Sequence, residues 1–326
     1  MPDHSIEVIA MDIYRTPETR FEHLPDYAFE PHYREVDGLR VHYVDVNARE
    51  VPTILLLHGE PTWSYLYRHM IPILSRTGQR VVAPDLIGFG KSDKPTRLED
   101  YSYRRHVDWL KELVRRLELR HITLFCQDWG ALIGLRVAAE EPDRFDRIAV
   151  GNGALPRSGR HPGVGIVNAA AFLAWRTFAQ FTPRFPAGRI VDFGCKRMLS
   201  ADERRAYDAP FPVDEAQAGA RAFPRLVPLL PSDPELRECQ TAWESLSRWE
   251  KPFLTTFSDG DPITRGFERV FQSRVPGARN QPHWTPHGGH FLQEDVGPEL
   301  AQRIEEWIEA TPIQRRSPPQ VVGPRA

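Results

Sequence analysis

The sequence predicts an α/β fold, a mostly parallel sheet flanked by helices, with an inserted all-helical segment. Short apolar strand-like runs alternate with runs of helical spacing along most of the 326 residues, which is typical of this class. The alternation stops between about residues 156 and 239, where prolines punctuate helical pieces. It resumes at Phe253. The insertion therefore splits one domain and does not separate two consecutive ones.

Six strand-like runs support the sheet: residues 39–46, 53–58, 80–84, 121–127, 147–151 and 253–258. A helix is expected after Ser102, a good N-cap residue, because apolar residues follow it at helical spacing. They are Val107, Leu110, Val114 and Leu117. Near the C-terminus the same spacing recurs at Leu300, Ile304 and Ile308.

These patterns predict the domain organisation. Residues 1–30 form an N-terminal extension, residues 31–155 and 240–311 form the core domain, and residues 156–239 form a helical cap. The edge of the cap is expected to form the mouth of a pocket. Residues 312–326 are rich in proline and lack periodicity, so we expect a disordered tail.

Composition excludes several classes of protein. Hydrophobic residues make up 41% and charged residues 26% of the chain, as in ordinary soluble proteins. A net charge of -2 gives no electrostatic basis for binding nucleic acid or an anionic membrane. The three cysteines lack metal-ligand spacing, and no window approaches 18 apolar residues. We therefore expect a cytoplasmic protein without nucleic-acid or membrane partners.

The most informative position for chemistry is Asp128. It lies between the apolar run that ends at Gln127 and a helical run that begins at Trp129. This order is typical of a nucleophile elbow, which exposes one side chain and directs backbone N–H groups at the reacting atoms. A serine attacking a saturated carbon would leave a stable ether, whereas an aspartate leaves an ester that water can hydrolyse. The elbow therefore indicates displacement at an sp³ carbon.

Four further motifs follow predicted strands or precede the last helix. They are His58-Gly-Glu-Pro-Thr-Trp63, Asp85-Leu-Ile-Gly-Phe-Gly-Lys-Ser92, Ser258-Asp-Gly-Asp-Pro262 and His287-Gly-Gly-His-Phe291. A nucleophile, an acid and a histidine in this chain order match the α/β-hydrolase triad.

From about Tyr14 to Trp307, the chain resembles haloalkane dehalogenases of the α/β-hydrolase superfamily. The Gln-Asp-Trp-Gly motif around Asp128 together with His-Gly-Glu-Pro-Thr-Trp carries most of the resemblance, because the other motifs occur across many hydrolases of this fold. One branch of the family has an asparagine directly after His-Gly. Glu60 at that position favours the branch with a halide-binding tryptophan in the cap.

The resemblance implies a catalytic triad. Asp128 would be the nucleophile, His290 the base that activates water, and Asp261 the acid that orients His290. Asp259 could also follow the last strand, but the Asp-Pro pair and the family pattern favour Asp261. His287 is a competing base, and it is disfavoured because the family motif places the base directly before Phe-x-Gln-Glu.

The resemblance also implies the groups that hold charge. Glu60 and Trp129 would supply backbone N–H groups to the oxyanion hole, and the indoles of Trp129 and Trp175 would hold the leaving halide. A halide takes negative charge but needs no proton, so weak fixed N–H donors suit it. The role of Trp175 depends on the matched segment, since an aromatic side chain on a cap helix is ordinarily packed in a core. No metal or organic cofactor is implied.

Three other functions fit the sequence less well. Epoxide hydrolases of this fold resemble one another in using two cap tyrosines as proton donors, but after Tyr103 this chain has only Tyr207. Haloacetate dehalogenases would need arginines beside the nucleophile, whereas Arg136 lies two turns along the helix. A non-catalytic ligand-binding protein would usually lack a triad member.

The expected function is therefore hydrolytic dehalogenation of a small neutral haloalkane. Water would be the second substrate, and a primary alcohol and a halide would be the products. The reaction would pass through an alkyl ester on Asp128, in a protein that we expect to be a monomer.

Overall fold

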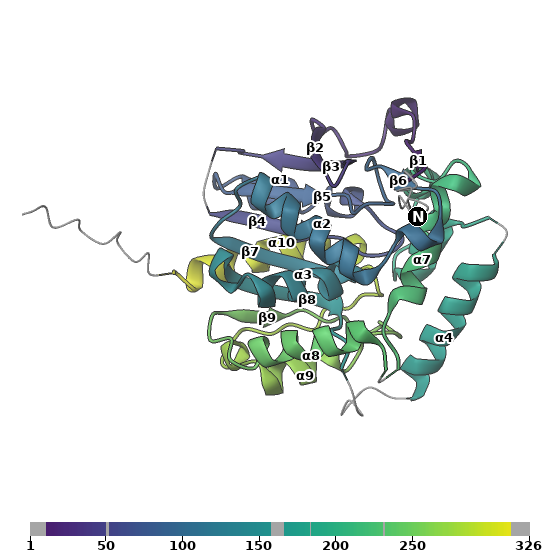
Figure 1. Ribbon diagram of the computed structural model, residues 1–326. Helices are drawn as coiled ribbons and strands as arrows, with labels where there is room; N and C mark the ends of the chain where they lie inside the picture. Colours follow the sequence, from purple (N-terminus) through teal and green to yellow (C-terminus); the bar gives the residue numbers. More distant parts are fainter. Residues whose placement is uncertain (1–10, 50–51, 158–165, 183, 231, 314–326) are drawn as a thin grey trace, which may run out of the picture.

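The computed structural model describes residues 11–49, 52–157, 166–182, 184–230 and 232–313. Its centre is a seven-stranded sheet in the order β2-β3-β5-β4-β7-β8-β9 (Figure 1). Strand β3 is antiparallel to β2 and β5, and the other neighbouring pairs are parallel. The strands are β2 (His32–Val36), β3 (Leu39–Val46), β4 (Thr53–Leu57), β5 (Arg80–Pro84), β7 (Ile122–Asp128), β8 (Phe145–Gly153) and β9 (Phe253–Thr255). The predicted mostly parallel sheet is confirmed.

All six predicted strands are present, but three strands were not predicted. Strand β2 buries only Val36, because it is an edge strand and leaves most of its side chains partly or fully accessible. It therefore lacks the apolar run that identifies an inner strand. Strands β1 (Ile13–Tyr14) and β6 (Lys94–Pro95) form a separate two-stranded sheet. They are too short to show periodicity.

Helices cover both faces of the sheet. In β4, Leu55 and Leu57 belong to one apolar cluster, and Ile54 and Leu56 belong to another, since successive side chains in a strand point to opposite faces. The first cluster includes α2 (Tyr103–Arg116), α3 (Trp129–Glu140), α8 (Pro234–Leu246) and α9 (Phe267–Arg274). The second includes α1 (Ile71–Ser75) and α10 (Leu292–Ala310). Burying each leucine contributes about 1.5–3 kcal/mol.

The two predicted helices are confirmed. The Ser102 hydroxyl accepts a hydrogen bond from the backbone N–H of Arg105 at 3.1 Å and so caps α2, as expected for a serine at this position. The four apolar residues that predicted the helix are buried. Near the C-terminus, Leu300, Ile304 and Ile308 are buried along α10.

A series of helices separates β8 from β9. It comprises α4 (Ile166–Phe181), α5 (Ala187–Gly194), α6 (Ala201–Asp208), α7 (Ala218–Leu226) and then α8. Helices α4 and α7 lie beside one end of the sheet in Figure 1. Helix α8 spans the predicted boundary between residues 239 and 240 and packs against α3.

The domain boundaries stay a prediction. Within the expected extension, cap and tail, residues 1–10, 158–165, 183, 231 and 314–326 lie outside the described residues. In the part of the chain that is described, no helix combines the length and the apolar character needed to cross a membrane.

Candidate active site

The strand-to-helix turn at Asp128 has an unusual backbone. Asp128 ends β7 with φ 51° and ψ −124°, and α3 begins at the next residue. Such a conformation is costly for a residue other than glycine and is typical of functional sites. A Cβ atom on Gly130 would lie 2.1 Å from the Leu57 carbonyl oxygen. Only glycine therefore lets α3 start this close to β4.

The Asp128 carboxylate lies against the loop that follows β4. Its Oδ1 atom accepts a hydrogen bond from the backbone N–H of Glu60 at 2.8 Å. A Cβ on Gly59 would lie 2.2 Å from the same oxygen, so the loop approaches the carboxylate with bare backbone. Trp129 is the first residue of α3, and the first N–H groups of a helix have no partner within it. The Glu60 backbone N–H thus lies at the carboxylate as predicted, and an oxyanion role for the Trp129 N–H stays a prediction.

His290 lies between two carboxylates. Its Nε2 atom is 3.4 Å from Asp128 Oδ2, and its Nδ1 atom is 3.0 Å from Asp261 Oδ1. Asp261 also accepts hydrogen bonds from the backbone N–H groups of Ile263 and Thr264, at 2.9 and 3.0 Å. Burial alone would raise the pKa of Asp261, but His290 and these hydrogen bonds hold it below its usual range. Asp261 is therefore an anion that orients the imidazole.

The two competing residues pair with each other instead. Asp259 Oδ2 lies 2.9 Å from His287 Nδ1, and both side chains are exposed. Both aspartates follow β9 in the same turn, and the sequence favoured Asp261 through the Asp-Pro pair and the family pattern. The structure places Asp261 at His290 and leaves Asp259 at the surface.

The charge of Asp128 affects the protonation of His290. Burial alone would lower the pKa of His290, but the charge of Asp261 and the hydrogen bond and charge of Asp128 raise it to about 10. His290 is therefore protonated at neutral pH. Loss of the Asp128 charge would lower the pKa of His290 and favour the neutral imidazole, which can act as a base.

The Asp128→Asn variant tests this electrostatic coupling. The amide keeps the shape of the side chain but removes its charge, so the pKa of His290 should fall from about 10. Titration of the His290 ring by NMR measures the change, and intact mass excludes deamidation. The control is Asp259→Asn, which removes a charge beside His287 instead. An unaltered His290 pKa in Asp128→Asn would contradict the coupling.

The two predicted tryptophans lie in the same apolar region. Trp129 is buried and contacts the rings of Tyr103 and Phe223, with centroids at 5.4 and 4.5 Å. Trp175, on α4, is partly buried and lies 6.1 Å from the ring of Phe185. Both tryptophans pack with one core cluster. A shared halide between the two indoles stays a prediction.

The side chain of Glu60 has a role that the sequence did not indicate. It is buried, and its Oε1 atom has no hydrogen-bond partner among the residues that the structure describes. Burial raises the pKa of Glu60 well above its usual value, and the charge of Asp128 adds to this; His290 and a hydrogen bond from Trp175 act in the opposite direction. The Glu60 side chain is therefore a buried carboxyl group near Asp128, His290 and Trp175.

Comparison with known proteins identifies the family. A family model described as the alpha/beta hydrolase fold matches residues 52–196. The haloalkane dehalogenase of Mycolicibacterium paratuberculosis is 53% identical over 305 residues, which are 92% of this chain and 99% of that protein. The haloalkane dehalogenase of Psychrobacter cryohalolentis is 50% identical over 308 residues, 93% of this chain and 100% of that protein. The chain belongs to the haloalkane dehalogenase family.

A solved structure supports the same assignment. The haloalkane dehalogenase DpaA from Paraglaciecola agarilytica, described as tetrameric, superposes with a TM-score of 0.82 at 33% identity. The similarity covers 90% of this chain and 97% of that one. The resemblance predicted from the motifs is thus confirmed, and so is the α/β-hydrolase fold. The roles of the individual site residues are proposals.

Two polar residues at this dehalogenase site were missed as functional residues. Gln127 Nε2 lies 3.2 Å from both Nε2 and the carbonyl oxygen of His290. Asn152, at the end of β8, donates to the carbonyl oxygens of Gly289 and His290 at 2.8 and 2.9 Å. Gln127 belongs to the Gln-Asp-Trp-Gly motif, which offered a signal. Asn152 belongs to no motif, because its partners are 137 and 138 residues away in sequence.

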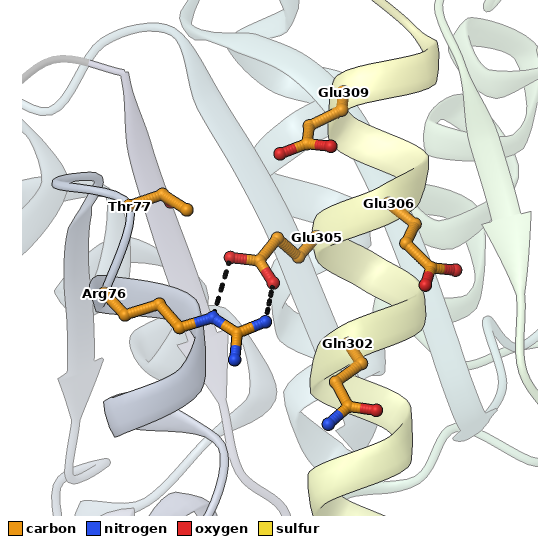
Figure 2. Close-up of a pocket in the computed structure, with 6 residues that line it drawn as sticks. All are labelled: Arg76, Thr77, Gln302, Glu305, Glu306 and Glu309. Atoms are coloured by element: carbon orange, nitrogen blue, oxygen red, sulfur yellow. Dashed lines mark hydrogen bonds and ion pairs between the residues drawn. The ribbon is translucent and has the colours of Figure 1, made fainter.

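A surface pocket elsewhere contains none of the predicted site residues. It lies between α1 and α10 and is lined by Arg76, Thr77, Gln302, Glu305, Glu306 and Glu309 (Figure 2). Arg76 Nη2 pairs with Glu305 Oε2 at 2.5 Å. Glu305 lies more than three turns from the start of α10, whereas His290 lies just before that helix.

Among the described residues, no group of three or more His, Cys, Asp and Glu side chains could hold a metal ion.

Proposed function

We propose that the chain hydrolyses the carbon–halogen bond of a small neutral haloalkane to give a primary alcohol and a halide. The observation that carries the proposal is Asp128 at a strained elbow, with the Glu60 N–H at 2.8 Å on one oxygen and His290 at 3.4 Å from the other. The haloalkane dehalogenases that are about 53% identical over nearly the whole chain support it.

The first step forms an ester. A carboxylate oxygen of Asp128 attacks the saturated carbon, the carbon–halogen bond breaks, and the halide leaves with the bonding electrons. The indole N–H groups of Trp129 and Trp175 stabilise the departing anion. No proton is transferred, so His290 remains protonated during this step. The product is a neutral alkyl ester of Asp128.

The second step hydrolyses that ester. Once Asp128 has no charge, the pKa of His290 falls and the imidazolium releases its Nε2 proton to solvent. The neutral Nε2 atom then accepts a proton from the attacking water. The resulting hydroxide attacks the carbonyl carbon of Asp128, and the backbone N–H groups of Glu60 and Trp129 stabilise the oxyanion. The ester bond then breaks and the alcohol leaves with the proton from His290. The proton of the resulting Asp128 carboxylic acid passes to the neutral His290, which restores both the carboxylate and the imidazolium. Each oxyanion donor contributes ~10²–10³ in rate and the base ~10²–10⁴.

Two rival reactions are disfavoured by side-chain contacts. An epoxide hydrolase needs a free hydroxyl to protonate the ring oxygen, but the Tyr207 hydroxyl is buried and donates to Glu294. A haloacetate dehalogenase needs a free arginine for the substrate carboxylate. Arg136 pairs instead with Glu235 at 2.5 Å and with Glu140 at 3.3 Å. Both observations favour a neutral haloalkane.

We also propose that the protein is a cytoplasmic monomer that needs no cofactor.

The purified protein should release bromide from short bromoalkanes, and Asp128→Ala should release none, because it has no nucleophile. Halide release over a panel of chain lengths measures this. Activity should be unchanged by chelators. Absence of halide with every bromoalkane, together with diol formation from an epoxide, would reverse the ranking of the two functions.

In His290→Phe, the first step should proceed and the second should stop, because the base is absent but the nucleophile is not. Intact mass spectrometry after incubation with 1-bromobutane should show the protein with one added butyl group. The double variant Asp128→Asn/His290→Phe is the control and should keep its original mass. An unmodified His290→Phe protein would count against the ester mechanism.

Trp175→Phe should weaken bromide binding, since phenylalanine keeps the ring but lacks the N–H donor. Hydrogen bonds to charged groups contribute about 1.5–3 kcal/mol, which corresponds to roughly 10- to 100-fold in affinity. Bromide inhibition of turnover measures the effect. The control is Trp284→Phe, whose indole lies against Arg303. Equal bromide affinity in Trp175→Phe and wild type would remove Trp175 from the halide site.

A further inference from the structure

One carboxylate connects the loop that carries His290 to the cap. Asp295 lies in the first turn of α10. Its Oδ2 atom accepts a hydrogen bond from the backbone N–H of Gly289 at 2.7 Å, and its Oδ1 atom accepts from the backbone N–H groups of Lys196 and Arg197, both at 2.9 Å. Hydrogen bonds to an ionised acceptor are stronger than neutral ones. Asp295 therefore holds two segments that are far apart in sequence.

The loop that carries His290 and the cap segment also contact each other through the backbone at glycines, where no side chain intervenes. A Cβ atom on Gly289 would lie 2.1 Å from the carbonyl oxygen of Gly194, at the end of α5. A Cβ atom on Gly194 would lie 2.6 Å from the ring of Phe291. The backbone N–H of Phe291 donates to the Gly194 carbonyl oxygen at 3.4 Å. The cap backbone thus lies directly on the residues that flank His290.

The loop that carries Asp261 joins this contact. The backbone N–H of Gly260 donates to the Gly288 carbonyl oxygen at 3.0 Å. A Cβ atom on Gly260 would lie 2.4 Å from Lys196 Cε. The acid loop, the base loop and the cap therefore meet within a few residues of the His290–Asp261 pair, so a shift of any one of them displaces the imidazole.

We propose that Asp295 is a positioning residue for the hydrolytic step. It fixes Gly289 against the cap, and this contact keeps His290 Nε2 next to Asp128. The inference rests on the function proposed above. Among the described residues, the hydrogen bonds of Asp295 go to Gly289, Lys196 and Arg197. The elbow and the loop at Glu60 are separate from these contacts. Alkylation of Asp128 is therefore independent of Asp295, whereas ester hydrolysis depends on it.

The adjacent Glu294 keeps the helix and the cap in place when Asp295 is altered. It forms a bidentate pair with the buried Arg68 at 2.5 and 2.9 Å. It also accepts hydrogen bonds from Tyr207 on α6 and from Arg197. These contacts fasten the cap and α10 to the core without the help of Asp295. The effect of an Asp295 substitution is therefore confined to the segment next to His290.

The test separates the two chemical steps in Asp295→Asn. Asparagine has one acceptor oxygen for three N–H donors, and its own NH₂ group faces one of them. Rapid-quench measurement of the first bromide released reports alkylation, and intact mass during turnover reports the ester. The rate of alkylation should match that of wild type. The rate of ester hydrolysis should fall by roughly 10- to 100-fold, as expected for a misplaced catalytic group, so the ester should accumulate. Glu299→Gln, on the exposed side of α10, is the charge-matched control and should behave as wild type.

A second variant acts from the cap side. Gly194→Ala changes no charge, but its added methyl group would clash with the Phe291 ring, so this variant should also accumulate the ester. It tests the proposal independently if Asp295→Asn fails to fold. Equal slowing of both steps, or hydrolysis at the wild-type rate in a folded variant, would overturn the positioning role. A different result would overturn the proposed function: no bromide release by the wild-type protein, together with no ester in His290→Phe.

Discussion

The site depends on the charge of Asp128 beside His290. In the proposed mechanism the Asp128 carboxylate is the nucleophile, and together with Asp261 it raises the pKa of His290 to about 10. Esterification removes the charge, so the imidazole loses one of the two anions that kept it protonated. The base is therefore generated by the first step and is available only when there is an ester to hydrolyse. The order of the two steps follows from electrostatics, without any movement of the chain.

This arrangement requires a backbone that the rest of the fold must hold. The positive φ of Asp128 costs on the order of 1–3 kcal/mol, and it is maintained because β7 and α3 are buried almost completely. Gly130 lets the helix pass the Leu57 carbonyl, and Gly59 lets the next loop reach the carboxylate. The buried sheet thus offsets the strain, and the elbow directs the Asp128 carboxylate at the backbone N–H of Glu60.

The sequence predicted the features that are local. Inner strand β4 is apolar at every position after Thr53 because both of its faces are covered, and the elbow is a continuous strand-turn-helix segment. Edge strand β2 was missed because only Val36 is buried in it. The preference for Asp261 over Asp259 came from the Asp-Pro pair and the family pattern, since the contact with His290 is made across 29 residues of sequence. Asn152 and Asp295 contact backbone atoms of distant segments, and such contacts have no signature in the sequence.

The cap contacts the catalytic groups at two separate places. Helices α4 and α7 bring Trp175 and Phe223 to the nucleophile side, next to Glu60 and Trp129. Residues 194–197 instead lie on the base loop through Asp295 and the paired glycines. Two different segments between β8 and β9 therefore contact the two sides of the candidate site, α4 and α7 at Glu60 and Trp129 and residues 194–197 at the loop that carries His290.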